Sequence, residues 1–496
     1  MMHHLPALVF LIPFCAAFCL PLAAMRNERR SRPIALAALC CTAIAALASL
    51  WSVLTTEEIR YSFGGWAPPI GIEWVADDVA SIMAVVVTLL AVVCVLYASP
   101  FHGVHKGPLE GRMVPHYAIV LILVSGLIGV IYSGDLFNIF VFLEIVALSG
   151  YALVAVPGGR ALVSAFRYLL MGALGASFYL LGVAYFYAAT GTLNIADLAQ
   201  RIPGLLESKA VIGGLIFMFI GLGIKMALVP LHAWLPDAYT DADDSSAPIL
   251  AALLTKVALL GWVRILFWVV GAGEGAQPAP VFALVWSLGV LGAVGGAFLA
   301  LSQTNLRRMF AYGGIAHIGL VLIGVGQASH TGLTGGLFYL VNDAVMQCTL
   351  FILAGVVAHQ YGVRTLDDLA RAHVRSPWIL GAFVIVGVSM IGLPPTGGFF
   401  GKWYIVLSVV EAGNYVALGA IIITTLLTLA YFVRLLERLF RGAREPGAKE
   451  SVEESSPLPA AFRISIAAPA AAIIGLGLFS DRIVNVLLNA TSGLGL

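Results

Sequence analysis

The chain has 496 residues, of which 60% are hydrophobic and only 11% are charged, whereas a soluble domain is about half apolar and about one quarter charged. Its formal net charge is +1, and no basic stretch is dense enough to follow a phosphate backbone, so the composition excludes nucleic acid as a partner. The lipid bilayer is the expected surrounding, and the chain is predicted to be an integral membrane protein.

The first apolar run covers residues 5–25 and is followed by a group of arginines. A signal peptide carries its positive charge before the apolar core and not after it. We therefore interpret this run as a retained membrane helix. The arginines that follow it are Arg26, Arg29, Arg30 and Arg32.

Apolar runs of similar length follow along the whole chain. A helix needs about 20 apolar residues to cross a hydrocarbon core of about 30 Å, so the sequence predicts an all-α protein of about fourteen transmembrane helices. The runs lie near residues 5–25, 33–54, 75–98, 115–134, 136–156, 161–190, 210–235, 247–271, 279–301, 308–327, 332–358, 377–411, 414–436 and 459–480.

Arginine and lysine are concentrated in the odd-numbered connections between these runs. The positive-inside rule places such connections in the cytoplasm, so both termini are expected on the outer side of the cell membrane. The seventh connection, residues 237–246, is an exception because it is acidic, although acidic residues weigh little in this rule. The odd connections hold Arg26 to Arg32, Lys106, Arg112, Arg160, Arg307, Arg308, Arg364, Arg371, Arg375, Arg438, Arg441, Arg444 and Lys449, and the even ones only Arg60, Arg201 and Lys209.

The connections leave no room for an extended soluble domain. The longest, at residues 55–74, 190–209 and 437–458, have about twenty residues each, and the last is predicted to be a flexible loop from its Pro, Gly and Ser content. No histidine pair at haem-ligand spacing and no glycine-rich phosphate loop is found. The six cysteines all fall inside apolar runs, where they are interpreted as packing residues. We therefore expect no cofactor and no metal.

Two ionisable residues lie inside apolar runs, where a charge is costly and usually marks an ion path. Glu144 is in the middle of the fifth run, and Lys256 is inside the eighth. Each has an alternative interpretation. Glu144 could belong to a static ion pair between helices, and Lys256 could extend to the lipid headgroups.

Two further lysines accompany predicted interruptions of membrane helices. Lys225 precedes the segment PLHAWLPDA at residues 230–238, and Lys402 ends the segment GLPPTGGFFGK at residues 392–402. Proline interrupts a helix and frees backbone carbonyls, which membrane proteins tolerate where they line a hydrated cavity. Half-helix ends beside ionisable groups recur in transporters. An ordinary proline kink is the alternative.

These segments resemble the antiporter-like subunits of respiratory complex I and of Mrp-type antiporters. The resemblance rests on Glu144, on Lys225 with residues 230–238, on LTK at residues 254–256, on QTNLRRMFAY at residues 303–312 and on residues 393–403. It implies two inverted five-helix units, each with a discontinuous helix, and a charged axis along the membrane plane. The units are expected at residues 115–271 and 279–436, after three helices in residues 1–114 and before a cytoplasmic loop and a last helix in residues 437–496.

The resemblance also implies roles in proton transfer. Glu144 and Lys225 would be an interacting pair, Lys256 the bridging group and Lys402 the terminal group. A lysine that separates from its carboxylate partner can release a proton, so Lys225 would pass its proton toward Lys256. The chemistry is proton transfer through side chains and water, with no covalent step and no catalytic residue.

His232 and His317 fall where the family often has polar relay residues, although a packed or merely hydrated histidine is an equally good interpretation. The sequence departs from the family in the eleventh run, where Tyr339, Asp343 and Gln347 replace histidines and a lysine. This departure either breaks a proton wire through that helix or leaves a wire that uses water and Asp343. Arg167, where lysine is commoner, and Gly313-Gly314, in place of a serine pair, are interpreted as neutral changes.

The segment FGGWAPPIGI at residues 63–72, together with Ala76-Asp77-Asp78, is similar to the D-type subunit of Mrp sodium/proton antiporters. We therefore expect a proton-translocating subunit of a multisubunit Na⁺/H⁺ antiporter that works with other membrane subunits. The alternative is a proton-pumping subunit of complex I, the NADH:quinone oxidoreductase, or of a membrane-bound hydrogenase, in which the chain would be part of a translocase. A third hypothesis is a scaffold whose charges only hold helices together. No carboxylate cage for sodium is recognisable in the sequence.

Overall fold

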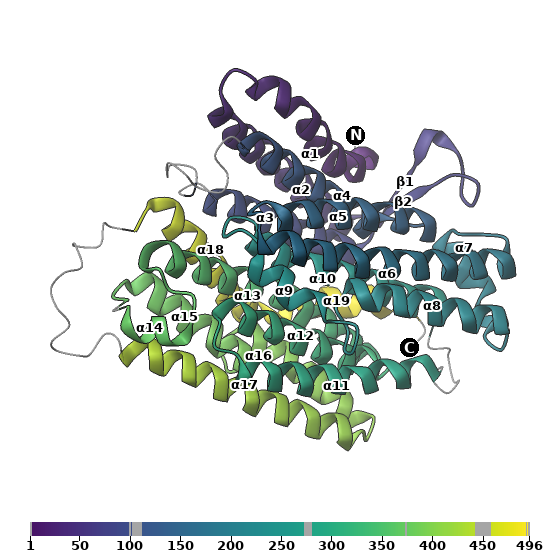
Figure 1. Cartoon of the computed structure of the whole chain (residues 1–496). Helices are drawn as coiled ribbons and strands as arrows, with labels where there is room; N and C mark the ends of the chain where they lie inside the picture. The colour runs from purple at the N-terminus through teal and green to yellow at the C-terminus, as the bar shows by residue number, and fades with distance from the viewer. Residues whose placement is uncertain are drawn as a thin grey trace.

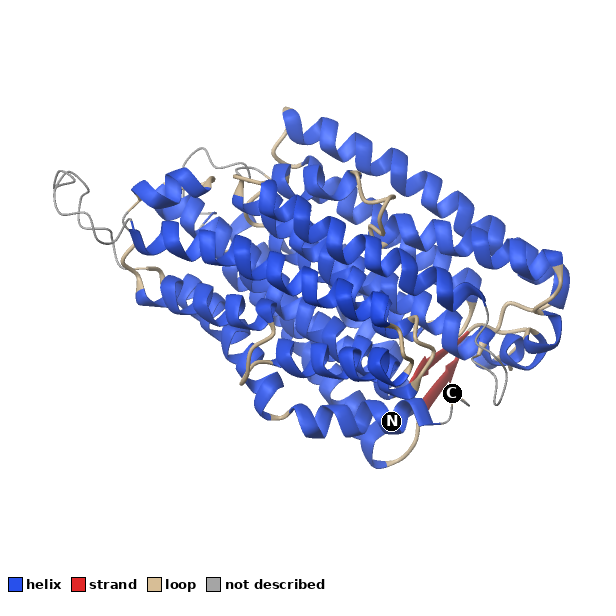
Figure 2. Ribbon diagram, turned by 90° about the horizontal axis from the view of Figure 1, so that it is seen from below, coloured by secondary structure: helices blue, strands red, loops and turns tan. Residues whose placement is uncertain are grey.

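The computed structural model describes residues 2–98, 101, 112–271, 280–372, 374–441, 458–492 and 494. Lys106, Arg444 and Lys449, together with most of the predicted loop at residues 437–458, lie outside the described residues. The described chain is almost entirely helical, with one pair of short strands beside the helix ends (Figure 2).

Twelve helices in the described residues are long and apolar enough to cross a membrane. They are α1 (Leu5–Ala24), α2 (Ser31–Thr55), α3 (Asp78–Tyr97), α4 (Met113–Tyr132), α5 (Leu136–Ala155), α6 (Arg160–Thr190), α10 (Ala247–Arg264, continued by a π turn at Ile265–Val270), α11 (Pro280–Ser302), α12 (Leu306–Val325), α13 (His330–Tyr361), α17 (Tyr415–Arg441) and α18 (Ala460–Leu478).

Two more apolar segments form interrupted helices, so the predicted fourteen segments are confirmed. The first is α8 (Lys209–Lys225) followed by α9 (Trp234–Asp241), and the second is α15 (Pro377–Ile391) followed by α16 (Gly397–Glu411). Local sequence explains both breaks. Pro230 lies between α8 and α9, and α15 ends at Gly392, which has a φ of 88° that favours glycine.

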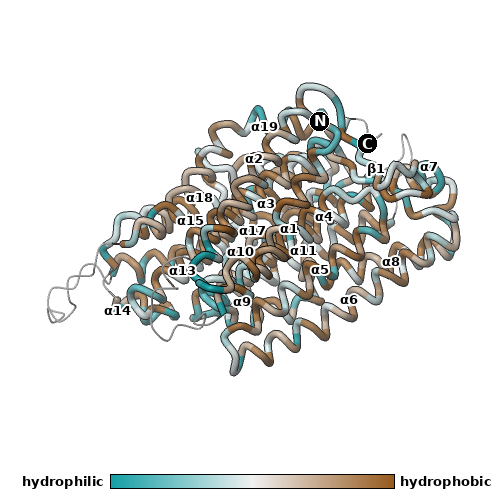
Figure 3. Tube along the Cα trace, turned by 90° about the horizontal axis from the view of Figure 1, so that it is seen from above, coloured by the Kyte–Doolittle hydropathy of each residue, from teal (hydrophilic) through white to brown (hydrophobic). Residues whose placement is uncertain are grey.

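Several short elements lie in segments that the sequence did not assign to membrane helices. Strands β1 (Ile59–Ser62) and β2 (Glu73–Ala76) form an antiparallel hairpin with Ile59 opposite Ala76. Short helices α7 (Ile195–Arg201) and α14 (Leu366–Arg371) precede the interrupted helices, and α19 (Ser480–Ser492) follows α18. Figures 2 and 3 place both ends of the chain near the strands, at one end of the helix bundle.

The same kind of backbone contact occurs in each of the two inverted five-helix repeats. In each repeat the start of a membrane helix, α5 or α12, pairs with the segment that leads into a short helix, α7 or α14. The hydrogen bonds are Leu136 N to Leu193 O (3.0 Å) and Ile195 N to Gly134 O (2.9 Å) in the first repeat, and Leu306 N to Arg364 O (3.0 Å) and Leu366 N to Thr304 O (2.9 Å) in the second.

Helices α10 and α13 occupy the interior, between the edge formed by α1 and α2 and the edge formed by α11 and α17 (Figure 1). The most apolar stretch of each is buried along its whole length inside the protein, and α13 contacts α3, α10, α12, α15, α16, α18 and α19. Hydrophilic residues gather mainly at the connections in Figure 3. Polar side chains within these buried stretches of α10 and α13 are therefore shielded from lipid by other helices.

Candidate functional site

The predicted pair of Glu144 and Lys225 is present. Glu144 lies in the middle of α5, and Lys225 is the last residue of α8, directly before the interruption. Nζ of Lys225 donates a hydrogen bond to Oε1 of Glu144 at 2.8 Å. Exposure differs within the pair, since the Lys225 side chain is 7% exposed and that of Glu144 is 30% exposed. The structure thus joins residues that are 81 positions apart.

Lys256 is fully inside the protein on α10. Its Nζ atom lies 3.0 Å from Oδ2 of Asp343 and donates a hydrogen bond to the carbonyl oxygen of Ala251 at 3.0 Å. Both charged side chains are only 2% exposed. The alternative that Lys256 reaches the lipid headgroups is therefore wrong, because the ammonium group is directed into α13.

Asp343 on α13 bridges two cationic or potentially cationic groups. Its Oδ2 atom faces Lys256, while Oδ1 lies 2.7 Å from Nδ1 of His317 on α12. His317 is completely buried. The sequence indicated both residues only as possible relays. The signal that could have identified the cluster was Asp343, a carboxylate within an apolar run.

Lys402 lies in α16, after the second interruption, and reaches back across it. Its Nζ atom donates to the carbonyl oxygens of Met390 (2.8 Å) and Ile391 (3.1 Å), which end α15, and lies 3.5 Å from Oγ1 of Thr425 on α17. Carbonyl groups at the C-terminal end of a helix carry partial negative charge and lack helical partners. They therefore stabilise an ammonium group.

His232 lies in the interruption between α8 and α9, and its ring centroid is 6.2 Å from that of Tyr312 on α12. In the described part of the chain no hydrogen bond or ion pair joins His232 to Glu144 or to the site lysines. The structure thus brings Lys256, Asp343 and His317 together, and places His232 apart from them.

Two departures from the family pattern are explained by the packing. A Cβ atom on Gly314 would lie 3.1 Å from Nε2 of Gln347, so the glycine on α12 makes room for the amide on α13. Arg167 on α6 donates to Oδ2 of Asp237 at 3.0 Å. Arg167 therefore belongs to an ion pair, and Gly314 lies directly beside the amide of Gln347.

The acidic seventh connection is neutralised by arginines from other parts of the chain. Asp237 on α9 pairs with Arg167 of α6 and with Arg308 of α12. Asp241 pairs with Arg160, and Asp244 with Arg307. Arg160, Arg307 and Arg308 come from odd-numbered connections, and Arg167 comes from α6. These ion pairs explain why the seventh connection can be acidic.

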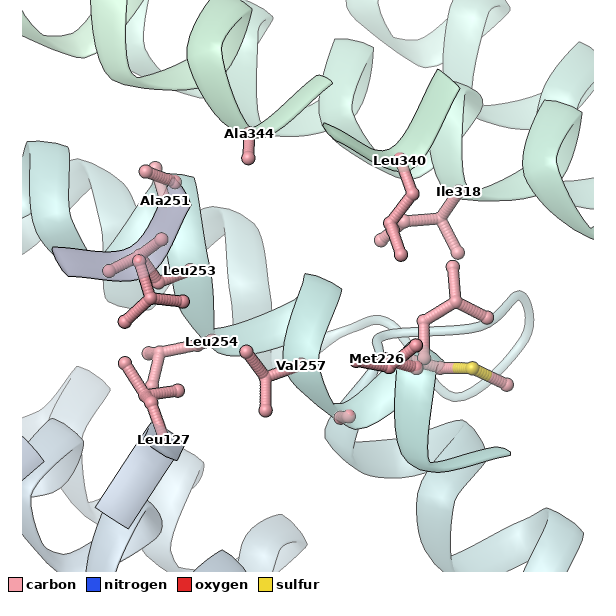
Figure 4. Packing of buried hydrophobic residues seen from close by; sticks show 14 of the residues in the cluster. Leu127, Met226, Ala251, Leu253, Leu254, Val257, Ile318, Leu340 and Ala344 are labelled. Carbon is pink, nitrogen blue, oxygen red and sulfur yellow. The ribbon is translucent and has the colours of Figure 1, made fainter. Parts of the chain in front are cut away.

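Apolar side chains from several helices pack together in the interior. Figure 4 shows Leu127 of α4, Leu254 and Val257 of α10, and Met226, the residue after Lys225, directed into the interior. Among the described residues no direct hydrogen bond joins the Glu144 pair to Lys256. Proton transfer between them therefore needs water or a movement of side chains.

The candidate site consists of three lysines and two carboxylates, which are Lys225, Lys256, Lys402, Glu144 and Asp343. Lys402 is the lysine without a carboxylate partner in the described structure, and backbone oxygens hold it instead. Among the described residues, no group of three or more His, Cys, Asp or Glu side chains is placed to hold a metal ion. The arrangement provides proton donors and acceptors inside a membrane bundle.

Comparison with known proteins identifies similar chains. A family model described as the transmembrane part of NADH:quinone oxidoreductase and Mrp antiporters matches residues 133–428. Subunit N of the NADH-quinone oxidoreductase of Desulforudis audaxviator is 39% identical to this chain over 98% of both proteins. The putative antiporter subunit mnhD2 of Staphylococcus saprophyticus is 31% identical over 99% of this chain and 95% of its own length.

The fold is also that of a solved structure. A chain of the membrane-bound sulfane sulfur reductase, an archaeal respiratory membrane complex, superposes with a TM-score of 0.89 at 27% identity, and the match covers 99% of this chain and 97% of that one. The expected all-helical membrane fold with inverted repeats is thus confirmed.

Proposed function

Because the chain belongs to the NADH:quinone oxidoreductase/Mrp antiporter family, we propose that it is a proton-translocating subunit of a multisubunit membrane complex. The protons move along Glu144, Lys225, Lys256 and Lys402. The observation that carries this proposal is the 2.8 Å ion pair between Glu144 and Lys225, placed where a membrane helix is interrupted.

The ion pair supplies a switch. While Glu144 faces Lys225, the carboxylate stabilises the charged ammonium group. When the two separate, the lysine is left in an apolar interior, where a lone charge is costly, and it releases its proton. The interruption after Lys225 allows such a separation, because α8 can shift without moving a continuous helix.

For the assembly, we propose first a Na⁺/H⁺ antiporter of the Mrp type in the cell membrane, with both termini outside. The support is the segment at residues 63–72 and the antiporter subunit of Staphylococcus saprophyticus, whose likeness extends over almost the whole chain. In such an assembly other membrane subunits complete the path for the cation.

A second candidate is a redox-driven proton pump, in which a partner subunit performs the electron transfer. The observation that favours it is the 39% identity to a subunit of an NADH-quinone oxidoreductase over 98% of both chains. The site residues would have the same proton-transfer roles, and only the driving reaction would differ.

Proton transfer is tested with Lys225→Met and Glu144→Gln in the native complex, in vesicles with a pH-sensitive dye. Both variants should lose dye-detected proton movement while the complex still assembles on a native gel. Lys209→Met is the matched control, since Lys209 is an exposed lysine at the other end of α8. Failed assembly of both variants on the native gel would instead support the scaffold hypothesis.

The type of assembly is tested by mild solubilisation of native membranes and identification of the subunits that co-migrate with this chain. Small membrane subunits alone, with proton movement driven by a sodium gradient, are expected for the antiporter. Iron–sulfur or flavin subunits, with proton movement driven by an electron donor, would replace that proposal with the redox-driven pump.

A further inference from the structure

We propose that Asp343 is a counter-ion shared by Lys256 and His317, so that only one of the two carries a positive charge at a time. This inference rests on the proposed function and deepens it, because it assigns the step between the bridging and terminal lysines. The residues on three neighbouring helices, α10, α12 and α13, would act as one unit.

The two carboxylate oxygens of Asp343 contact different residues. Oδ2 of Asp343 is 3.0 Å from Nζ of Lys256, and Oδ1 is 2.7 Å from Nδ1 of His317. Each oxygen thus serves a different partner. All three side chains are almost completely buried, at 2% exposure or less.

One buried carboxylate can neutralise one positive charge. With Lys256 charged and His317 neutral, the three groups sum to zero, and they also sum to zero with Lys256 neutral and His317 charged. A third arrangement, with both cations present, leaves an uncompensated charge inside the protein, which is strongly unfavourable. Binding of a proton to one group therefore favours release from the other.

The hydrogen bond to Asp343 also determines which histidine nitrogen exchanges protons. A carboxylate that accepts from Nδ1–H fixes the imidazole in that tautomer and leaves Nε2 as the basic atom. Nε2 of His317 is buried and has no hydrogen-bond partner in the described structure. Nε2 is thus the atom of His317 that takes up and releases the proton.

Protons and charge balance in this step. An N–H bond of Lys256 forms with a proton delivered through water from the Lys225 side, while the Nε2–H bond of the His317 imidazolium breaks and its proton leaves through water toward Lys402. One proton enters and one leaves, so the net charge of the three groups stays constant. The reverse direction uses the same bonds.

The charged groups around His317 support this exchange. Asp343 is the carboxylate in contact with the ring, at 2.7 Å, and the same carboxylate contacts Lys256 at 3.0 Å. The ring of Tyr339 lies edge-on at a centroid distance of 5.5 Å and contributes no charge. A charged His317 is thus disfavoured until Lys256 gives up its own charge.

The first test is ¹⁵N NMR of histidine-labelled native complex, with the signal of His317 assigned from its loss in His317→Gln. The wild type should show a neutral ring with the proton on Nδ1. In Lys256→Gln, whose amide still donates to Asp343, the signals should shift to the imidazolium pattern. In Lys256→Gln combined with Asp343→Asn they should return to neutral. A neutral His317 in the single variant, or an imidazolium that persists in the double variant, would overturn the proposal.

The second test measures proton movement in vesicles. His317→Asn retains an amide donor near Nδ1 but has no Nε2, so proton movement should be lost while the complex assembles. Asp343→Asn should lose it as well, Asp343→Glu should restore part of it, and Asp481→Asn, which changes an exposed carboxylate on α19, should leave it unchanged. Full activity of His317→Asn would exclude Nε2 as the exchanging atom.

The two tests separate this inference from the proposed function. If Lys225→Met leaves proton movement intact, the proposed path is wrong, yet the NMR shift in Lys256→Gln would still show a shared counter-ion. If Lys225→Met abolishes proton movement and the NMR shift does not occur, the path stands and the shared counter-ion is rejected.

Discussion

Nε2 of Gln347 on α13 lies against Gly314 on α12, at 3.1 Å from the place where a Cβ atom of residue 314 would be. The nitrogen is buried and has no hydrogen-bond partner in the described structure. We predict that Gly314→Ser raises the thermal stability of the complex, because the serine hydroxyl can accept from Nε2, with a net gain of about 0.5–1.5 kcal/mol. Gly314→Ala is the control that adds the Cβ atom without the hydroxyl, and a serine variant no more stable than the alanine variant would contradict the prediction.

Gly319 lies where α12 packs closely against α11. A Cβ atom there would lie 2.6 Å from the carbonyl oxygen of Gly289, a backbone atom that cannot move aside. We predict that Gly319→Ala destabilises the protein by about 1–3 kcal/mol, because the two helices must separate. The measurement is thermal unfolding of the purified complex.

Gly295 on α11 provides the matched control for that substitution. No atom lies within 4 Å of a Cβ atom built on it. Gly295→Ala should therefore be neutral or stabilising, since alanine favours a helix over glycine by about 1 kcal/mol. Equal losses in Gly295→Ala and Gly319→Ala would show that helix separation is not the cause.

Asp237 forms ion pairs with Arg308 at 2.9 Å and with Arg167 at 3.0 Å. The Arg308 side chain is 32% exposed and the Arg167 side chain is 63% exposed. We predict that Arg167→Ala costs at most about 1 kcal/mol, as expected for an exposed ion pair, and that Arg308→Ala costs more. A double-mutant cycle with Asp237→Ala measures each pair. A larger loss for Arg167→Ala would reverse our ranking.

Lys402 differs from the other site lysines because backbone oxygens hold it. We predict that Lys402→Met abolishes proton movement, and that Lys402→Arg retains assembly because its guanidinium can still donate to the carbonyl groups of Met390 and Ile391. The measurement is dye-detected proton movement together with a native gel, and Lys209→Met is again the control. Proton movement at the wild-type rate in Lys402→Met would remove this residue from the path.

The predicted orientation can be tested with single cysteines in a cysteine-free chain. Glu57, in an even-numbered connection, and Arg26, in an odd-numbered one, are both exposed. Glu57→Cys should react with a membrane-impermeant maleimide added to intact cells, and Arg26→Cys should react only after the cells are opened. The opposite labelling pattern would invert the orientation.

The sequence predicted the helices and their interruptions well, because both depend on local properties. Runs of apolar residues determine which segments can cross a bilayer, and Pro230 and Gly392 mark where helices break. The hairpin of β1 and β2 was not predicted, since it depends on pairing between segments separated by a loop. The acidic connection was recognised as an exception, but its arginine partners come from other parts of the chain.

For the candidate site, the sequence by itself determined which ionisable residues lie in the membrane, because a charge within an apolar run is visible in one dimension. The resemblance implied the pair of Glu144 and Lys225, but the structure was needed to place Asp343 between Lys256 and His317 and to give Lys402 backbone carbonyls. Only the tertiary structure decided these latter partners. The physical reason is that such pairs depend on how the helices rotate and approach one another. The approach is determined by close packing, as at Gly314 and Gly319, and no local sequence pattern predicts it.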